Sequence, residues 1–189
     1  MPRSLGDADF DACYYEHGCG RPYARDAVWL EFFGRIADGI VARIGRGRTL
    51  DAGCAWGLLV EALRARGVEA FGCDISSYAM TQVAPAIRPY CRRSSITDDI
   101  GERYDLIVCQ EVLPHLTAEE GRAAIANICR HTDAVLFSCA TIDPTAARHR
   151  NAESLAAWRK VFEKNGFAVD PALDVTFMTP WALLLRRRE

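Results

Sequence analysis

The segment 49–57, TLDAGCAWG, combines residue types that suit a ligand bound through the main chain. Gly53 and Gly57 can adopt backbone angles closed to other residues and let a ligand approach the backbone closely. The helix expected to follow begins with unpaired N–H groups, which can donate to that ligand. Asp51 adds a carboxylate, which favours a ligand carrying a positive ammonium or sulfonium group. The segment therefore predicts a ligand-binding turn.

The spacing of this turn argues against a dinucleotide. A dinucleotide loop has the pattern G-x-G-x-x-G, whereas here the two glycines lie four residues apart with Ala55 between them. Asp51 would also repel a diphosphate. We therefore expect a cofactor other than NAD.

A second carboxylate follows in FGCDIS, where Asp74 lies 17 residues beyond Gly57 at the end of the next apolar segment. A carboxylate at that position can accept hydrogen bonds from both hydroxyls of a ribose. The alternative is that Asp74 only caps the next helix.

The elements that must position these residues follow from the hydrophobic pattern. From Arg48 onward, apolar segments of strand length alternate with segments of helical period, which is typical of an α/β fold with a parallel sheet. Ligands bind such a sheet beyond the carboxyl ends of its strands. The pattern predicts strands at 48–52, 69–74, 89–92, 104–109 and 133–139, and helices at 57–66, 77–87, 118–130 and 152–165. Thr117 and Glu120 form a capping box, and Gly166 is a helix stop.

Both ends of the chain add elements. Two apolar runs, 166–178 and 181–188, predict a final pair of strands joined by a short connection. Before the sheet, apolar residues recur with helical spacing at Val28, Phe32, Ile36, Ile40 and Ile44. We expect one domain over residues 1–189, with an N-terminal lid and helix at 1–46 and a core at 47–189.

Composition limits the partners. The chain has 189 residues, half of them apolar, and a formal charge of -2 with a pI near 6.1, so nucleic acid is not an expected partner. The three arginines at 186–188 are interpreted as a solvated terminus. No apolar run suggests a signal peptide or a membrane span, which predicts a soluble, cytoplasmic protein. The eight cysteines form no C-x-x-C pair and are interpreted as small hydrophobic residues.

The segment LDAGCAWG resembles motif I of the class I S-adenosylmethionine-dependent methyltransferases, D/E-x-G-x-G-x-G, with Ala55 in place of the middle glycine. FGCDIS resembles motif II, and RRSSITDDIGERYDLIVCQEVLPHL resembles the third and fourth motifs. The resemblance covers roughly residues 48–140. It implies a Rossmann-like, mostly parallel sheet of order 3-2-1-4-5-7-6 with the last strand antiparallel, and S-adenosylmethionine as the cofactor.

The resemblance also assigns residues to the cofactor. These are Asp51, Gly53, Cys54, Ala55 and Gly57 in the first motif, Asp74 and Ile75 in the second, Ser95 and Ile96 beside the adenine, and Gln110, with Glu111, beside the methionine portion. Asp98 or Asp99 is the alternative to Ser95 as the polar residue.

Methyl transfer is a displacement at carbon, so the enzyme chiefly aligns a nucleophile about 3 Å from the methyl group. A hydroxyl or protonated amine acceptor also needs a base. His115, just past the fourth strand, is our candidate, and the alternative is a helix-capping histidine. A metal-binding variant of the family reads E-x-x-E-H, but Pro114 stands at the second Glu, so we expect no catalytic metal.

The N-terminal stretch CYYEHGCGRPYAR suits a lid, because similar small-molecule methyltransferases fold a tyrosine-rich segment over their ligands. On that basis Tyr14, Tyr15 and His17 face the acceptor, and Tyr23 or Arg25 holds the cofactor's carboxylate. The alternative is that these aromatic residues only anchor the N-terminal helix. The loop TIDPTAARHRN, with His149, and His131 are further candidates for acceptor contacts.

The sequence thus predicts an enzyme that methylates oxygen or nitrogen of a small molecule such as a sugar, a sugar nucleotide or a natural-product intermediate. Two alternatives stay open: an RNA or protein acceptor, and a silent cofactor-binding domain that regulates a partner. The acceptor atom is not determined, and a homodimer is compatible with the sequence.

Overall fold

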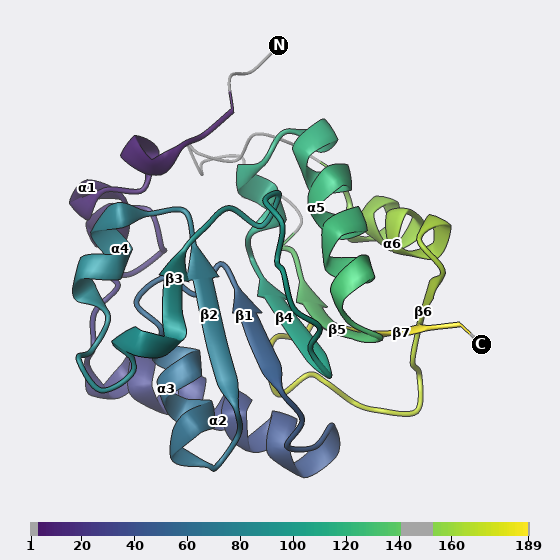
Figure 1. The fold of residues 1–189 in the computed structure, drawn as a ribbon, viewed down its shortest axis with the longest axis horizontal. Coiled ribbons are helices and arrows are strands. Elements are labelled where there is room, and N and C mark those ends of the chain that lie inside the picture. The colour runs from purple at the N-terminus through teal and green to yellow at the C-terminus, as the bar shows by residue number, and fades with distance from the viewer. Residues whose placement is uncertain (1–3, 141–152, 189) are drawn as a thin grey trace.

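The computed structural model describes residues 4–140 and 153–188, and its centre is a seven-stranded sheet between two layers of helices (Figure 1). The strands are β1 (Thr49–Ala52), β2 (Ala70–Asp74), β3 (Cys91–Arg93), β4 (Leu106–Gln110), β5 (Ala134–Ser138), β6 (Phe167–Val169) and β7 (Leu183–Arg187). Their order is β3-β2-β1-β4-β5-β7-β6, and β7 runs antiparallel to both of its neighbours. The predicted α/β class and strand order are confirmed.

The helices alternate with the strands as the pattern predicts. They are α1 (Ala12–His17), α2 (Ala27–Arg43), α3 (Leu58–Ala65), α4 (Ser77–Gln82), α5 (Ala118–His131) and α6 (Leu155–Lys164), with short 3-10 turns η1 (Asp7–Asp9), η2 (Arg88–Tyr90) and η3 (Leu113–His115). The capping box of Thr117 and Glu120 at the start of α5 is confirmed, and Gly166 follows α6 with a φ of 83°.

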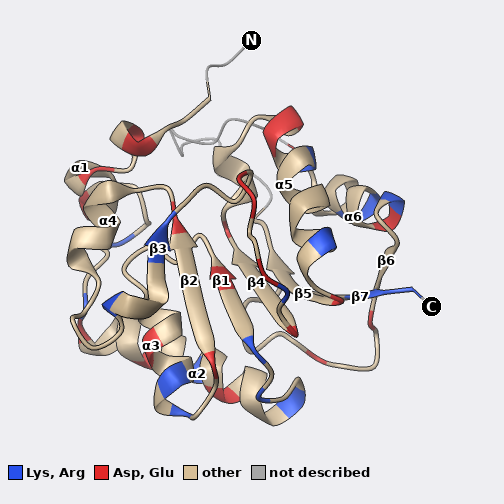
Figure 2. Cartoon of the chain, in the orientation of Figure 1, with Lys and Arg blue, Asp and Glu red and all other residues tan. Residues whose placement is uncertain are grey.

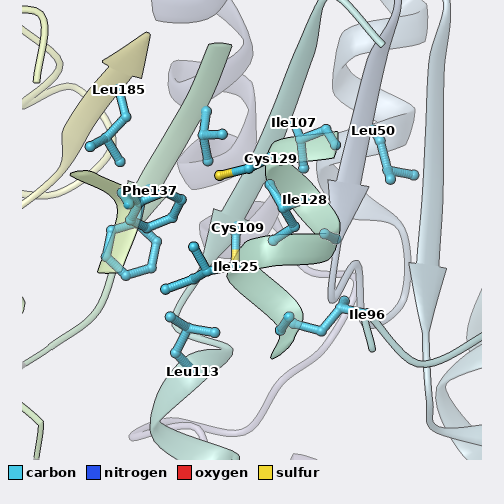
Figure 3. Close-up of a cluster of buried hydrophobic side chains, with 14 of the residues drawn as sticks. Leu50, Ile96, Ile107, Cys109, Leu113, Ile125, Ile128, Cys129, Phe137 and Leu185 are labelled. Atoms are coloured by element: carbon cyan, nitrogen blue, oxygen red, sulfur yellow. The ribbon is translucent and has the colours of Figure 1, made fainter. Parts of the chain in front are cut away.

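The alternation of side chains along each strand divides the core into two. Leu106 and Val108 of β4 pack with α2 and α3 on one face, whereas Ile107 and Cys109 pack with α5 and α6 on the other. Figure 3 shows this second cluster, with Cys109 of β4 close to Ile125 of α5. Strands buried on both faces explain the continuous apolar runs in the sequence.

Helix α4 ends at Gln82, so the prediction that it extends to residue 87 is wrong. The cause is Pro85, which has no N–H and disfavours helical angles at Ala84.

The expected long strand at 166–178 is also wrong, since β6 stops at Val169. Asp170 accepts a hydrogen bond from the backbone N–H of Ala172, and Asp174 accepts one from that of Thr176, so both carboxylates stabilise turns. Pro171 lacks the N–H that a continued ladder needs.

The amphipathic helix before the sheet is confirmed as α2, with Ile36 and Ile40 fully buried. Val28, which was expected on its apolar face, is 57% exposed. The first turn packs through Trp29, whose ring centroid lies 4.7 Å from that of Tyr23. Val28 is rotated about 100° from Trp29 on the helix and so faces solvent.

Candidate active site

The two predicted carboxylates and Gln110 lie at one edge of the sheet, where the parallel strands β1, β2 and β4 end. Asp51 is paired in register with Gly72 of β2 and Val108 of β4, and Asp74 and Gln110 are the last residues of their strands. The turn after β1 crosses this edge (Figure 1). The sheet order thus brings together residues that are far apart in the sequence.

The turn after β1 depends on left-handed backbone angles at three positions. Gly53 has a φ of 90°, Ala55 a φ of 47° and Gly57, the N-cap of α3, a φ of 73°. A Cβ atom on Gly53 would lie 2.3 Å from Cγ2 of Val112. Both the positive φ and this close contact therefore disfavour any residue with a side chain at position 53. Ala55, at the place of the motif's middle glycine, adopts a conformation that glycine adopts more readily.

Asp74 ties this turn to the end of β2. Its Oδ2 accepts a hydrogen bond of 2.8 Å from the backbone N–H of Ala55, and its Oδ1 accepts one of 2.9 Å from that of Ser76. Burial raises the pKa of Asp74, and these hydrogen bonds oppose the rise. The N-cap of α4 is Ser76, so Asp74 is not the cap of that helix. Each carboxylate oxygen keeps a lone pair for a further donor.

Asp51 is 5% exposed, and its surroundings favour its neutral form. Burial raises the pKa of Asp51 to about 7, and the nearby charge of Asp74 adds to the rise. A positively charged ligand group beside Asp51 would stabilise the ionised carboxylate. The surroundings of Asp51 therefore suit the binding of a cationic group.

The N-terminal segment brings two of the expected catalytic residues together. The hydroxyl of Tyr14 in α1 and Nε2 of His115 in η3 share a hydrogen bond of 3.2 Å across 101 residues of sequence. The rings of Phe10 and Tyr14 pack edge-on against the imidazole, with centroid distances of 5.5 and 5.7 Å. His115 therefore lies between the end of β4 and the N-terminal segment.

The other N-terminal candidates divide into two groups. Tyr15 and Tyr23 are 4% and 9% exposed, and both rings pack against Trp56 in the turn after β1. Burial raises the pKa of both phenols. The structure does not bring His17 to His115, because its side chain is 68% exposed and lies 3.7 Å from Glu16.

Arg25, the alternative to Tyr23 for the cofactor's carboxylate, forms an ion pair with Glu61 of α3. Its side chain is half exposed, and its guanidinium is engaged with that carboxylate. Tyr23, in contrast, is buried and its ring packs against Trp56 in the turn after β1.

The loop after β3 carries the residues expected beside adenine. Ile96 is 5% exposed and joins the cluster under α5 that Figure 3 shows, whereas Ser95 bonds within its own loop through Asp98 and Thr97. Asn127 of α5 holds this loop. Its Nδ2 donates to the backbone oxygens of Ile96 at 2.9 Å and Asp98 at 2.6 Å.

Sequence reasoning missed Asn127, although a signal was present. Asn127 is a polar residue within the apolar run AAIANIC of a helix, and it is 1% exposed. A buried amide must find hydrogen-bond partners, so such a residue points to a loop that it fixes. His131, at the end of α5, was a candidate for acceptor contacts. Its Nδ1 shares a hydrogen bond with the backbone oxygen of Asn127, and its Nε2 lies 3.3 Å from Oδ1 of Asp99.

Two polar atoms at this edge lack partners among the described residues. Oε1 of Gln110 and Nε1 of Trp56 are buried and form no hydrogen bond there. Buried polar atoms of this kind are costly unless a ligand or water pairs with them. A cofactor with ammonium, carboxylate and hydroxyl groups carries the complementary donors and acceptors, so the residues present fit it.

Glu111, next to Gln110, has a φ of 55°, which is uncommon for a residue with a side chain. Its carboxylate accepts hydrogen bonds from Oγ of Ser138, the backbone N–H of Ala140 and Nε1 of Trp181. The sequence placed Glu111 at this edge but gave no sign of Trp181, which lies in the connection after β6.

Other candidates lie elsewhere. His149 and the loop 141–151 fall within residues 141–152, outside the described part of the chain. Two cavities of about 200 and 150 Å³ lie away from the carboxyl ends of β1, β2 and β4. The first borders Gly47 and Asp105 at the opposite edge of the sheet, and the second borders Tyr90 and Tyr104.

Burial raises the pKa of the thiols of Cys73, Cys129 and Cys139 to about 12, as expected of small hydrophobic residues. In residues 4–140 and 153–188, Lys and Arg are interspersed with Asp and Glu (Figure 2). Across the same residues, no helix combines the length and apolarity that crossing a bilayer requires.

The sheet order, with its antiparallel β7 and helices on both faces, is that of the class I methyltransferase fold. Residues 50–134 match a family model described as a methyltransferase domain, in agreement with this fold.

The relatives agree with this assignment. The chain is 26% identical over 196 residues to the magnesium-protoporphyrin O-methyltransferase of Synechocystis sp., with 88% of this chain and 80% of the relative covered. It is similar in fold to the crystal structure of the Synechocystis magnesium protoporphyrin IX methyltransferase with bound S-adenosylmethionine. That pair has a TM-score of 0.67, 19% identity and full coverage of both chains. The 1,6-didemethyltoxoflavin-N1-methyltransferase of Burkholderia thailandensis has a TM-score of 0.69 at 16% identity, covering 100% of this chain and 93% of that one.

Proposed function

We propose that this enzyme binds S-adenosylmethionine across the carboxyl ends of β1, β2 and β4 and methylates an oxygen or nitrogen atom of a small molecule. The bound cofactor supplies an activated methyl group on a sulfonium. The single observation that carries the acceptor side of the proposal is the hydrogen bond of 3.2 Å between Tyr14 and His115. It joins a base and a phenol at the end of β4, where the cofactor's methyl group must point.

On the cofactor side, the main chain and two carboxylates do the binding. The backbone at Gly53 is open to close approach because neither φ nor Val112 permits a side chain there. Asp74 has lone pairs left for the ribose hydroxyls, and Asp51 is the acceptor for the ammonium group. The proposed cofactor-binding surface also includes the other residues of the turn after β1 and the residue that follows β2. These are Cys54, Ala55, Gly57 and Ile75.

The adenine side of the proposed site is formed by the loop that contains Ser95 and Ile96. The two hydrogen bonds from Asn127 fix the carbonyls of this loop, so its shape does not depend on the ligand. Gln110 lies toward the methionine portion, where its unpaired Oε1 can accept from the ammonium group.

For the chemical step, His115 takes the proton from the acceptor atom. Histidine is the side chain whose ordinary pKa lies closest to neutral pH, which suits proton removal, and the hydroxyl of Tyr14 shares a hydrogen bond with Nε2 of His115. Tyr15 and Tyr23 are buried phenols whose raised pKa keeps them neutral, so they serve as hydrogen-bond donors and water-excluding walls rather than bases.

The relatives favour oxygen as the acceptor atom. Two curated relatives are named as O-methyltransferases, one of magnesium-protoporphyrin and one of ubiquinone biosynthesis in Alkalilimnicola ehrlichii. The latter match covers 61% of this chain and 49% of that relative at 28% identity. We therefore propose a small acceptor that presents a hydroxyl or carboxyl oxygen.

Calorimetric titration with S-adenosylhomocysteine, the demethylated product, tests the cofactor site. The native protein should bind it, and Asp74→Ala should bind it more weakly by about 1.5–3 kcal/mol, the scale for hydrogen bonds to a charged group. Asp170→Ala, a carboxylate remote from the site, is the matched control. Unchanged affinity in Asp74→Ala would exclude the ribose role.

The catalytic assignment is tested separately by release of S-adenosylhomocysteine from a panel of phenols, carboxylic acids and amines. His115→Ala should lower turnover of whichever acceptor the native enzyme uses while leaving cofactor affinity nearly intact. Equal turnover in the variant would remove His115 as the base.

A further inference from the structure

A partly exposed tryptophan lies at the acceptor edge of the sheet with its polar atom already occupied. Trp181 is 42% exposed, and its Nε1 donates a hydrogen bond of 2.9 Å to Oε1 of Glu111. The indole therefore offers its ring face, but no hydrogen-bond donor, to a molecule arriving from solvent.

The carboxylate that holds Trp181 is itself fixed by two hydrogen bonds from the end of β5. Glu111 accepts 2.7 Å from Oγ of the fully buried Ser138 and 2.6 Å from the backbone N–H of Ala140. Its left-handed φ of 55° persists only where the surroundings over-determine it, and such strain gathers at functional sites. One carboxylate thus joins the ends of β4 and β5 to the connection that leads into β7.

The topology places the indole beside the proposed site of chemistry. Since β7 is antiparallel to β5, with Leu183 opposite Phe137, the residues just before β7 lie at the carboxyl end of β5. Glu111 follows Gln110 directly and precedes His115 by four residues. Trp181 therefore borders the region in which the acceptor must lie.

We propose that Trp181 is the platform of the acceptor subsite, that Glu111 positions it, and that the acceptor presents a planar aromatic ring to it. This inference rests on the proposed methyl transfer. A flat ring stacks on an indole face through dispersion and quadrupole interactions that do not need the N–H.

A sugar fits the same place less well. Carbohydrates are held by hydrogen bonds to their hydroxyls as well as by stacking. Here the indole N–H is engaged, and the Glu111 carboxylate already accepts three hydrogen bonds. The structure thus favours an aromatic acceptor over the sugar that the sequence suggested.

The test uses 2-naphthol as the probe, with methyl β-glucoside as the alternative, in the presence of saturating S-adenosylhomocysteine. Ligand-observed saturation-transfer NMR gives the dissociation constants. The native protein should bind 2-naphthol in preference to the glucoside. Trp181→Ala should weaken naphthol binding about tenfold, and Trp181→Phe should retain most of it. Val28→Ala removes another exposed apolar side chain, 57% exposed on α2, and should change nothing.

Glu111→Gln separates the positioning role from the platform itself. It places an amide donor among the donors of Ser138, Ala140 and Trp181, so naphthol affinity should fall although the indole is intact. Equal naphthol affinity in native protein and Trp181→Ala would overturn the proposal, as would Trp181-dependent binding of the glucoside alone or no binding of either probe.

Titration of each variant with S-adenosylhomocysteine is the separate control. Trp181→Ala should keep native cofactor affinity, which also shows that it folds. If the native protein failed to bind the cofactor product, the proposed function would fail. The naphthol affinities of the native protein and Trp181→Ala, measured without the cofactor product, would still decide the subsite.

Discussion

The raised pKa of Asp51 predicts that the free enzyme loses stability as pH rises, and that Asp51→Asn removes this loss. The carboxyl is 5% exposed, and its pKa of about 7 compares with 3.8 for the unperturbed group. A carboxyl whose pKa is raised by folding favours the folded state when protonated. Its contribution is therefore complete below about pH 4 and is lost as pH rises through about 7.

The size of the effect follows from the shift. Three pKa units correspond to about 4 kcal/mol at pH 8, an upper value because burial and Asp74 act on a coupled pair of carboxylates. Asparagine has nearly the same shape and no charge. Asp51→Asn should thus match the native protein near pH 4 and exceed its free energy of unfolding at pH 8.

Guanidinium unfolding of both proteins from pH 4 to 8.5, without ligand, measures the difference directly. Asp174→Asn is the matched control, since hydrogen bonds from Thr176 and the guanidinium of Arg43 lower the pKa of Asp174 to about 2. That carboxylate is ionised over the whole range, so its variant should show a constant offset. Parallel curves for native protein and Asp51→Asn would refute the electrostatic reasoning.

The same variant should bind the cofactor product worse although it is more stable. In the native protein, the ammonium group must meet an ionised Asp51, so affinity for S-adenosylhomocysteine should rise with pH up to about 7 and then level off. In Asp51→Asn this rise should be absent and the affinity lower throughout. A variant that keeps both the rise and the affinity would show that another group receives the ammonium.

Three further predictions concern the turn and the loop around the proposed cofactor. Ala55→Gly should raise the free energy of unfolding by about 0.5–1 kcal/mol, because it relieves a φ of 47°, and chemical denaturation measures it. Gly53→Ala should lower stability by more than 1 kcal/mol and reduce affinity for S-adenosylhomocysteine, since its Cβ would lie 2.3 Å from Val112; a native melting temperature would contradict the clash. Asn127→Ala should weaken binding of S-adenosylhomocysteine more than that of S-ribosylhomocysteine, which lacks the adenine, because only the adenine loop at Ile96 is released; an equal loss for both would indicate a purely structural role.

The order and direction of the strands were predictable because the apolar runs and the motif glycines each had one physical interpretation. Continuous apolar runs such as YDLIVC need burial on both faces, and only a parallel sheet covered by helices provides it. The motif glycines likewise indicated left-handed angles, which the structure has at Gly53 and Gly57. The short β6 was not predictable from hydrophobicity, because Val175 and Met178 are buried without being in a strand.

The site was predictable only where a residue's position along a strand fixes its location. Asp74 and Gln110 end their strands and Asp51 is the last residue but one of β1, so strand order alone brings them together at one edge. In α1, the burial of each side chain depends on which aromatic rings pack against the turn after β1. The sequence CYYEH therefore does not indicate that Tyr15 is buried while His17 is exposed.

The contacts that the sequence missed have a common character. Asn127 and Glu111 act through hydrogen bonds to partners more than twenty residues away, and neither partner set follows from periodicity. In both cases one buried or strained residue holds a loop at the carboxyl edge. In the proposed site, main-chain geometry fixes the cofactor side, which leaves little freedom for change. The proposed acceptor side rests on side chains such as Tyr14, His115 and Trp181, which can vary without disturbing the turn after β1. Specificity for the acceptor should therefore change through these side chains, while cofactor affinity should change through Gly53, Asp51 and Asp74.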